Sequence, residues 1–530
     1  MAKELLFNES AREKLIAGMC AMAEAVGSTL GPKGQCVIID EYSNGMPHIT
    51  KDGVTVAKNI TLEDKYQNVG ATLLRQAALN TVNAVGDATT TSTVLAYKMV
   101  ENAYEAYKNG IINISDLRKG IKIAEESVKE TILASSEEIK KEDVARIASI
   151  SANGDSEIGN LVAEMYDKVG LDGIITVEES ANNQTTTDVT NGMQFERGFA
   201  SHWFITDREK SECVLENAYV LVTDQKIQLT REIIPVAEYS VKNGHALLVI
   251  AQDFDDEVIQ NIRLNVLQGR IKCCLVKAPS FGDYRKGLLE DIAIITGAKI
   301  ATYDNGIEVS KMDGSMLGLC EKVVVTKDFT TLLHGAGNSD EVAKRVTELK
   351  YNLSTLQSGE ETLQKYYRGR IARLVGGIGV IRVGGNSELE MREKKDRIED
   401  AVCATKAALE EGIVPGGGLT FLKAWYNLPL DSNSAIQQGI NIVKNALTSV
   451  TEKIVNNAGF EFRSIESGIK PFENISWDAN TEKYVNFLDA GIINPTKADR
   501  LAFENALSVL NMFISTNCII IEKDIFKQYV

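Results

Sequence analysis

The chain has 530 residues, of which 44% are hydrophobic and 25% are charged. Because a single hydrophobic core rarely serves more than about 300 residues, we expect two or three domains. The 57 lysines and arginines and the 73 aspartates and glutamates give a net charge of −16, which argues against a general binder of nucleic acids or membrane surfaces.

The first residues lack the apolar core of a signal peptide, and no run approaches the roughly 18 apolar residues of a membrane span. We therefore expect a cytoplasmic protein. The eight cysteines and four histidines are scattered, without the spacing of a zinc site or a disulfide framework. Cys273 and Cys274 are interpreted as consecutive residues of a buried strand.

Three patterns follow one another along the chain. Residues 1–133 are mostly helical in pattern, with short strands near 37–40 and 49–50. From about 191 to 378, apolar runs at 218–222, 246–251, 271–277 and 323–325 alternate with helical patterns, which predicts a mixed or parallel sheet covered by helices. From about 388 the chain returns to long helices, and the apolar run 518–521 predicts a buried strand.

The segment Val85-Gly-Asp-Ala-Thr-Thr-Thr-Ser-Thr93 lies between two helical patterns. Gly86 can end the first helix and Asp87 can begin the second. Threonine hydroxyls and free amides at a helix start can hold phosphates, and Asp87 would then offer an oxygen ligand to Mg²⁺. The alternative is that Asp87 only caps a helix. The chain lacks a Walker A sequence, which excludes a P-loop enzyme.

Three other turns are weaker signals when taken alone. The turn at residues 29–34 can press its backbone against a phosphate, but such turns are common. Asp52 precedes Gly53 in what is otherwise a routine Asp-Gly turn. Pro415-Gly-Gly-Gly418 leaves bare backbone that can approach a nucleotide's sugar or base.

A helix is predicted from Glu388 to a stop at Gly412. An apolar stripe on this helix lies within an arc of about 60° and consists of Met391, Ile398, Val402, Thr405 and Leu409. Asp400 lies about 200° around the helix from this stripe. Asp400 is then either a surface carboxylate or a group that faces a polar cavity and orients water for attack on a γ-phosphate. A second apolar series, from Ile436 to Ile454, predicts one long helix that ends at Gly459.

A series of short motifs connects these segments: Leu30-Gly-Pro-Lys-Gly34, Thr50-Lys-Asp-Gly-Val-Thr-Val56, Gly86-Asp-Ala-Thr-Thr-Thr91, Ser151-Ala-Asn153, Gly192-Met-Gln-Phe-Glu-Arg-Gly198, Lys277-Ala-Pro-Ser-Phe-Gly-Asp283, Glu399-Asp-Ala401, Gly416-Gly-Gly418 and Pro495-Thr-Lys497. In this order, over essentially the whole chain, they resemble a group I chaperonin of the GroEL family, in a divergent form.

The resemblance implies a multi-domain fold. It comprises a mainly α equatorial domain, which binds ATP, at residues 1–133 and 411–530. A small α/β intermediate domain is expected at 134–190 and 379–410. An α/β apical domain, which binds substrate, is inserted at 191–378. Glycines at both borders of the middle region, Gly192, Gly376-Gly377 and Gly384-Gly385, fit hinges as well as ordinary turns.

The resemblance also assigns site residues. Asp52 and Asp400 would flank the attacking water as the catalytic pair, and Asp87 would bind Mg²⁺. Contacts to ATP are implied for Leu30, Gly31, Pro32, Lys51, Asp87, Ala88, Thr89, Thr90, Thr91, Gly417, Asp478, Asn480 and Asn494. The family also admits K⁺ as a second cation.

The implied activity is ATP hydrolysis coupled to the folding of non-native polypeptides in a homo-oligomeric ring. The ring would be heptameric, either single or double. Clients would bind apical residues, namely Phe199, Trp203, Phe204, Ile234, Ile259 and Leu264. The alternative is a holdase or structural ring with weak ATPase activity. An enzyme that uses ATP to transform a small molecule is disfavoured because the sequence shows no second catalytic constellation.

Departures from the family pattern fall on functional positions. Ala88 replaces a glycine, and a positive φ there would cost about 1 kcal/mol. Asp478 replaces a usual Asn, Asn480 a usual Ala near the base, and Asn494 a usual Asp beside the ribose. We therefore expect ATP binding with altered affinity or base discrimination.

Two further departures concern partners. Arg263 and Ala237 alter the apical groove, so a standard co-chaperonin loop is expected to fit poorly. Glu452 stands where GroEL has an arginine at the contact between rings, whereas Glu461 is retained. Two like charges would weaken that contact, which favours a weakened double ring or a single ring.

Overall fold

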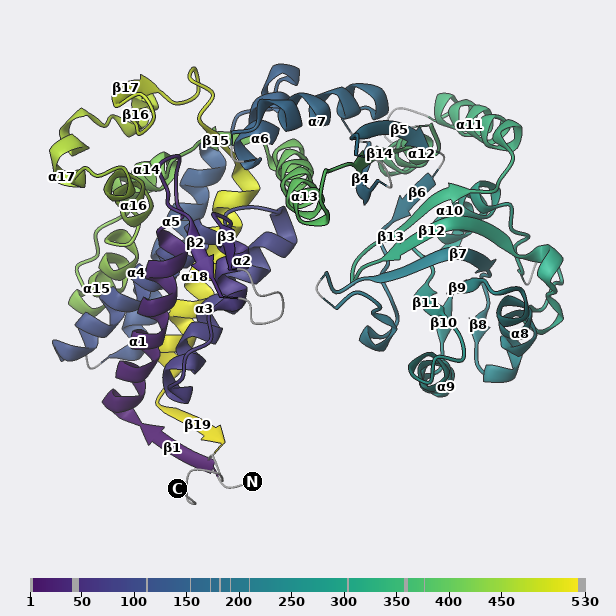
Figure 1. Ribbon diagram of the computed structural model, residues 1–530, viewed down its shortest axis with the longest axis horizontal. Coiled ribbons are helices and arrows are strands. Elements are labelled where there is room, and N and C mark those ends of the chain that lie inside the picture. Colours follow the sequence, from purple (N-terminus) through teal and green to yellow (C-terminus); the bar gives the residue numbers. More distant parts are fainter. Residues whose placement is uncertain are drawn as a thin grey trace. The chain divides into compact units, whose positions relative to one another are not determined.

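The computed structural model describes residues 3–40, 47–110, 113–152, 154–171, 173–180, 183–190, 192–208, 210–302, 305–356, 361–375 and 377–522 (Figure 1). Asn153 and Gly376, which belong to a predicted motif and a predicted hinge, lie outside these ranges. The chain forms two compact units. The first comprises residues 1–163 and 393–530, and the second comprises residues 164–392.

The first unit is a helical bundle. Its helices are α1 (Asn8–Gly27), α2 (Gly53–Asn59), α3 (Lys65–Val85), α4 (Thr89–Lys108), α5 (Ile114–Ala134), α6 (Lys141–Ser151), α14 (Leu419–Asn427), α15 (Ser434–Lys444), α16 (Ser449–Asn457), α17 (Phe462–Ile465) and α18 (Thr496–Ser515). Glycines let neighbouring helices approach closely: a side chain on Gly70 of α3 would strike the backbone of Leu15 in α1, and one on Gly120 of α5 would strike Ile436 in α15. The core between these helices is apolar and fully buried.

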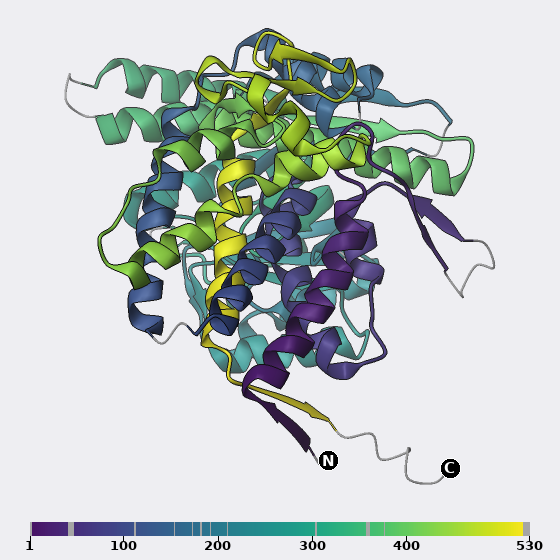
Figure 2. The same ribbon diagram turned by 90° about the vertical axis from the view of Figure 1, so that its left-hand side faces the viewer.

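Short two-stranded sheets accompany the helices of this unit. They are β1 (Lys3–Phe7) with β19 (Cys518–Glu522), β2 (Val37–Ile39) with β3 (His48–Thr50), β15 (Ile413–Pro415) with β18 (Ile493–Pro495), and β16 (Ile475–Asp478) with β17 (Lys483–Asn486). All four pairs are antiparallel. Figure 2 shows β1 in purple and β19 in yellow, side by side near the chain ends.

Two predicted elements of this unit differ in the structure. The expected long helix between residues 436 and 459 is two helices, α15 and α16. Between them the amides of Ala446 and Leu447 bond carbonyls three residues back, which tightens the turn, while the apolar face continues. The strand at 518–521 is also only half buried, because a two-stranded sheet packs one face: Ile519 is buried and Ile520 is exposed.

The second unit is built on a mixed six-stranded sheet of order β11-β9-β7-β12-β13-β6. The strands are β6 (Gly192–Phe195), β7 (Cys213–Val222), β9 (Ala246–Ala251), β11 (Cys273–Lys277), β12 (Gly318–Val325) and β13 (Thr330–Gly335). Strands β7, β9 and β11 are parallel, and the other neighbours are antiparallel. This is the mixed sheet that the apolar runs predicted, and Cys273 and Cys274 lie in a buried strand as expected.

Smaller elements complete the second unit. A three-stranded sheet has the order β4-β14-β5, from Ile174–Glu179, Ile378–Val383 and Thr186–Thr190, and the short strands β8 (Lys226–Ile227) and β10 (Asp253–Phe254) form a pair. The helices are α8 (Ile234–Asn243), α9 (Asp256–Leu267), α10 (Gly282–Thr296), α11 (Ser339–Ser354) and α12 (Glu361–Val375). Helices α7 (Ser156–Val169) and α13 (Glu388–Glu411) each have residues in both units.

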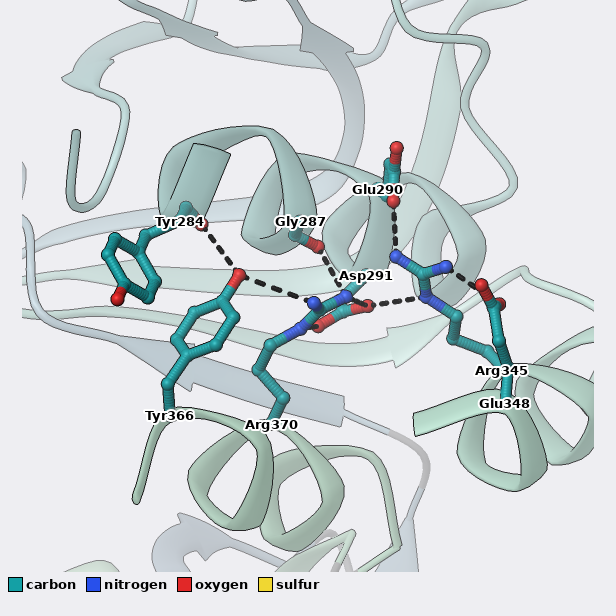
Figure 3. A network of polar contacts seen from close by, with 8 residues as sticks. All are labelled: Tyr284, Gly287, Glu290, Asp291, Arg345, Glu348, Tyr366 and Arg370. Carbon is teal, nitrogen blue, oxygen red and sulfur yellow. Dashed lines mark hydrogen bonds and ion pairs between the residues drawn. The ribbon is translucent and has the colours of Figure 1, made fainter. Parts of the chain in front are cut away.

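A buried ion-pair network joins helices α10, α11 and α12 (Figure 3). Asp291 of α10 is fully buried and accepts hydrogen bonds at 2.6 Å from both Nε and Nη2 of Arg370. Arg345 of α11 donates to the same carboxylate at 3.1 Å. Both carboxylate oxygens of Asp291 thereby accept hydrogen bonds from arginines. The two guanidinium groups compensate the buried negative charge, and their contacts attach α11 and α12 to α10.

Candidate functional site

The segment between α3 and α4 contains two consecutive helix boundaries. Gly86 ends α3 with φ 71°, in the left-handed region that glycine favours, as the sequence predicted. The N-cap residue of α4 is Ala88, with φ 65°, and not Asp87 as expected. Because alanine has no side-chain oxygen, it cannot cap α4, and the first-turn amides of Thr89, Thr90 and Thr91 remain available to an anion.

Asp87 is therefore not the N-cap residue of α4. Its Oδ1 accepts the amide of Ala88, and its Oδ2 accepts the hydroxyl of Ser151 at 3.3 Å. Burial raises the pKa of Asp87 above the ordinary aspartate value, these two hydrogen bonds oppose the rise, and the negative charge of Asp52 adds to it. A cation would stabilise this carboxylate.

Asp52 is the N-cap of α2. Its carboxylate accepts the amides of Val54 at 3.1 Å and Thr55 at 2.8 Å, which is the capping role typical of an Asp before a helix. The next residue, Gly53, lies directly against α4: a Cβ there would be 2.4 Å from Oγ1 of Thr90. The start of α2 thus adjoins the threonines that begin α4.

Asp400 reaches the same place from α13. It is partly buried, and its pKa is raised to about 9 by burial first and then by the negative charges of Asp52 and Asp87. Of the two interpretations left open by the sequence, the exposed surface carboxylate is wrong. Three carboxylates from three separate segments therefore lie within electrostatic reach of one another.

Helix α13 contacts residue 86, Asp155 and helix α18. A Cβ on Gly86 would be 2.2 Å from Cβ of Cys403 and 3.5 Å from the carbonyl oxygen of Asp400, so the helix rests directly on residue 86. Arg397 of α13 forms an ion pair with Asp155 at 3.3 Å. Near its end, α13 is joined to α18 by the Glu411–Arg500 ion pair, with Arg500 Nε 2.9 Å from Oε2.

The predicted turn at residues 29–34 is fixed by side chains from elsewhere in the sequence. Asn457 of α16 donates its amide hydrogens to the carbonyls of Gly27 and Leu30, at 2.9 Å each. Lys51 Nζ donates to the carbonyl of Pro32 at 3.2 Å, which ties this turn to the segment before Asp52. Gly31 has φ 83° and packs against Ile454.

The residues expected near a sugar or base belong to two further loops. The Gly416–418 turn follows β15, and Asn494 lies opposite Val414 on the neighbouring strand β18. A Cβ on Gly416 would be 3.0 Å from Oδ1 of Asn494, and one on Gly417 would be 2.8 Å from the ring of Phe487.

Asp478 serves mainly to build its own turn. Its carboxylate accepts the amide of Asn480 at 2.9 Å and the hydroxyl of Thr481 at 2.6 Å. An ion pair between Lys33 and Glu482, at 2.7 Å, joins this turn to the 29–34 turn. All of the predicted nucleotide residues therefore lie in the first unit.

Among the described residues no group of three or more His, Cys, Asp or Glu side chains is arranged to hold a metal ion. Mg²⁺ is usually bound by one or two carboxylates and takes its other oxygen ligands from phosphates and water.

The predicted client-binding residues lie in the second unit and fall into two groups. Trp203, Ile234 and Leu264 are 41%, 44% and 51% exposed, whereas Phe199 and Ile259 are partly buried against the core. Phe204 departs from the expectation of exposure, because it is fully buried. It follows Trp203 in a short 3₁₀ turn, where successive side chains point about 120° apart, so one of the two faces the core.

Residues 22–524 match the TCP-1/cpn60 chaperonin family. The chain belongs to this family. The structure is also similar to crystal structures of the chaperonin gp146 from the bacteriophage EL 2 (Pseudomonas aeruginosa), obtained in the presence of ATP-BeFx, with TM-scores of 0.72 and 0.64 for crystal forms II and I. In both comparisons the identity is 22%, and 98% of this chain and 99% of the phage chain are covered.

The multi-domain chaperonin fold expected from the motifs is thereby confirmed. Within the described residues of this chaperonin, no helix is long and apolar enough to cross a membrane.

Sequence reasoning missed three residues that shape the candidate site. Asn457 holds the 29–34 turn, Ser151 binds Asp87, and Asp499 of α18 binds Asn494 at 2.9 Å. Asn457 and Asp499 carry no motif that would mark them. Ser151 belonged to a recognised motif, Ser151-Ala-Asn153, and that signal could have been followed to Asp87.

Proposed function

We propose that this chaperonin binds and hydrolyses ATP and uses the cycle to capture and release non-native polypeptides. The observation that carries the proposal is the meeting of Asp52, Asp87 and Asp400 beside the uncapped start of α4. Phosphates suit an uncapped helix start, and the carboxylates of Asp87 and Asp400, whose pKa values are raised, suit a cation that accompanies the phosphates. Crystallisation of the related phage chaperonin in the presence of ATP-BeFx supports this ligand.

Each segment has a proposed role toward the nucleotide. Asp87 would hold Mg²⁺ and the α4 start would hold the phosphates, with Thr89, Thr90 and Thr91 as donors. The remaining contacts would come from Leu30, Gly31, Pro32, Lys51, Ala88, Gly417, Asp478, Asn480 and Asn494. K⁺ stays a proposed second cation.

Asp52 and Asp400 would orient the attacking water. In the ligand-free site the pKa of about 9 keeps Asp400 protonated at neutral pH, so it cannot act as a base. A cation held at Asp87 would lower the pKa of Asp400, and Asp400 could then orient the water as a carboxylate. Since α13 runs from one unit into the other, seating Asp400 on the nucleotide would couple the first unit to the second.

Clients would bind exposed apolar side chains of the second unit. Trp203, Ile234 and Leu264 offer such surface, and Val241 and Leu267 extend it on α8 and α9. The guanidinium of Arg263 lies 4.2 Å above the Trp203 ring and makes a cation–π contact with it. This contact partly satisfies the positive charge that we expected to alter the apical groove. We expect a standard co-chaperonin loop to fit this surface poorly.

We also propose a homo-oligomeric, heptameric ring in the cytoplasm. Exposed apolar residues on two small sheets, Leu5, Phe7 and Ile520 on β1–β19 and Ile38 and Ile49 on β2–β3, support self-association. A ring multiplies weak client contacts by valency. Glu452 and Glu461 favour a weak contact between rings or a single ring.

Phosphate release and client capture test the proposal together. Asp400→Ala and Asp52→Ala should each lower ATP turnover at least about 100-fold while capture of a denatured test protein is unchanged. A purified oligomer whose turnover survives both changes would overturn the proposed site.

One observation favours the alternative of a holdase with weak ATPase activity. Ala88 adopts φ 65° at the phosphate loop, a conformation that costs an alanine about 1 kcal/mol. In a holdase, wild-type turnover would already be near background, and the Asp400→Ala variant would capture and release clients like the wild type.

A further inference from the structure

Asp499 is a buried carboxylate that packing does not explain. It lies in the first turn of α18 with 0% of its surface exposed, next to Ala498, which packs against Val85 and Ala407. Burial raises its pKa to about 7, and the negative charge of Asp87 adds to the rise. An apolar residue would be more stable at such a position, so the carboxylate invites a functional explanation.

The contact that Asp499 makes is directional. Nδ2 of Asn494 donates to Oδ1 of Asp499 at 2.9 Å, whereas Oδ2 of Asp499 is buried without a hydrogen-bond partner among the described residues. Above its pKa of about 7, Asp499 is ionised and only accepts hydrogen bonds, whereas a side-chain amide has one donating end and one accepting end. Asp499 therefore selects the orientation in which the NH₂ of Asn494 faces it.

The other end of the amide then has a defined direction. Oδ1 of Asn494 faces the Gly416–418 turn, 3.0 Å from the place where a Cβ on Gly416 would stand. The pairing of β18 with β15, with Asn494 opposite Val414, keeps the two segments in this register. The acceptor oxygen of Asn494 thus faces a turn of three glycines, which contribute no side chains of their own.

We propose that Asp499 is a positioning residue that holds the Asn494 oxygen toward the Gly416–418 turn, where it accepts a hydrogen bond from a ribose hydroxyl of the bound nucleotide. The inference deepens the proposed function and rests on it. An Asn at position 494 can accept from a hydroxyl only in one of its two amide orientations, and Asp499 fixes that orientation. Without Asp499, the amide can turn its NH₂ toward the hydroxyl's place, and the selection for that hydroxyl is lost.

Binding of ATP, 2′-deoxyATP and 3′-deoxyATP to the full-length oligomer, measured by calorimetry with Mg²⁺, tests this proposal. The wild type should bind one of the two deoxynucleotides about 5- to 10-fold more weakly than ATP, the effect of one hydrogen bond. In Asp499→Asn, whose amide can donate as well as accept, this ratio should fall below about 2. Asp489→Asn, the same change at an exposed position, should keep the wild-type ratio.

A general loss of affinity weakens the binding of ATP and of the deoxynucleotide equally, so it does not change the ratio of the two affinities. If Asp499 had only a structural role, Asp499→Asn would therefore keep the wild-type ratio. Asn494→Ala should likewise remove the difference in affinity between ATP and the deoxynucleotide, and it provides the test if Asp499→Asn does not fold. The inference is overturned if either variant keeps the full ratio, or if the wild type binds ATP and both deoxynucleotides equally well. A wild type that binds no nucleotide would instead overturn the proposed function, and this inference with it.

Discussion

A Cβ atom on Gly86 would lie 2.2 Å from the Cβ atom of Cys403. Gly86 ends α3 immediately before Asp87, and Cys403 lies on α13 one turn after Asp400. The helix that carries Asp400 can therefore rest on the loop that carries Asp87 only because residue 86 has no side chain.

Replacing Gly86 by alanine should accordingly impair both stability and turnover. The methyl group meets Cys403, and φ 71° is itself unfavourable for alanine, so we expect a loss of about 2–4 kcal/mol in the free energy of unfolding and at least a 10-fold fall in ATP turnover. Gly110→Ala is the matched control, because Gly110 has φ 87° with no atom within 4 Å of the added methyl group. It should lose only about 1 kcal/mol and keep its turnover. Equal losses in the two variants would contradict the close contact.

Ala88→Gly should stabilise the protein. At φ 65°, alanine pays a steric cost that glycine does not, and relief of that cost outweighs the extra chain entropy of glycine when the conformation is left-handed. Urea unfolding should show a gain of about 0.5–1 kcal/mol. Ala134→Gly, at the end of helix α5, should instead lose about 0.5–1 kcal/mol. A loss in both variants would mean that Ala88 is helical.

These two positions show what the sequence could and could not predict. Gly86 was correctly predicted to end a helix, because glycine after an apolar helical pattern is a strong local signal. Nothing local marks Ala88 as left-handed, since alanine ordinarily favours helix. The angular position of Asp400 on its helix does not show whether its carboxylate is exposed, because the burial of that carboxylate depends on how α13 packs against other segments.

Long-range contacts escaped sequence reasoning for the same reason. Asn457 reaches the carbonyls of residues 27–30 across more than 400 positions, and no periodicity encodes that contact. The break between α15 and α16 was missed because an apolar stripe reports which face is buried and not whether the backbone is continuous.

The raised pKa of Asp400 predicts an unusual pH dependence in the absence of nucleotide and metal. An unfolded aspartate ionises near pH 4, but Asp400 in the folded protein keeps its proton up to about pH 9. Between these values the folded state binds one more proton than the unfolded state, so stability falls as pH rises. Asp499, with a pKa of about 7, adds to the fall only between about pH 4 and 7.

Asp400→Asn removes this titration. In EDTA, its melting temperature should exceed that of the wild type at pH 8 and should decline less between pH 7 and 9. Asp489→Asn, at an exposed position, should follow the wild type. If the Asp400→Asn and wild-type curves are parallel over this interval, Asp400 ionises normally in the folded protein.

The buried network of the second unit gives a stability prediction. Arg370→Met leaves the buried Asp291 carboxylate paired with Arg345 alone. The free energy of unfolding should fall by about 3–5 kcal/mol, and limited proteolysis should cleave helices α11 and α12 more readily. Glu290→Gln alters a more exposed member of the same network and should cost at most about 1 kcal/mol. Similar losses would indicate that the exposed pair, and not Asp291, holds the helices.

The contrast between Leu264 and Phe204 separates client binding from folding. Leu264 is half exposed on α9, so Leu264→Ser should leave the unfolding free energy within about 0.5 kcal/mol of the wild type and still weaken capture of a denatured test protein. Phe204 is fully buried, so Phe204→Ser should destabilise the second unit by about 3–5 kcal/mol. Capture per folded molecule should then be near normal for Phe204→Ser, measured at a temperature where the variant remains folded. If Phe204→Ser instead folds normally and loses capture, Phe204 must leave the core when a client binds.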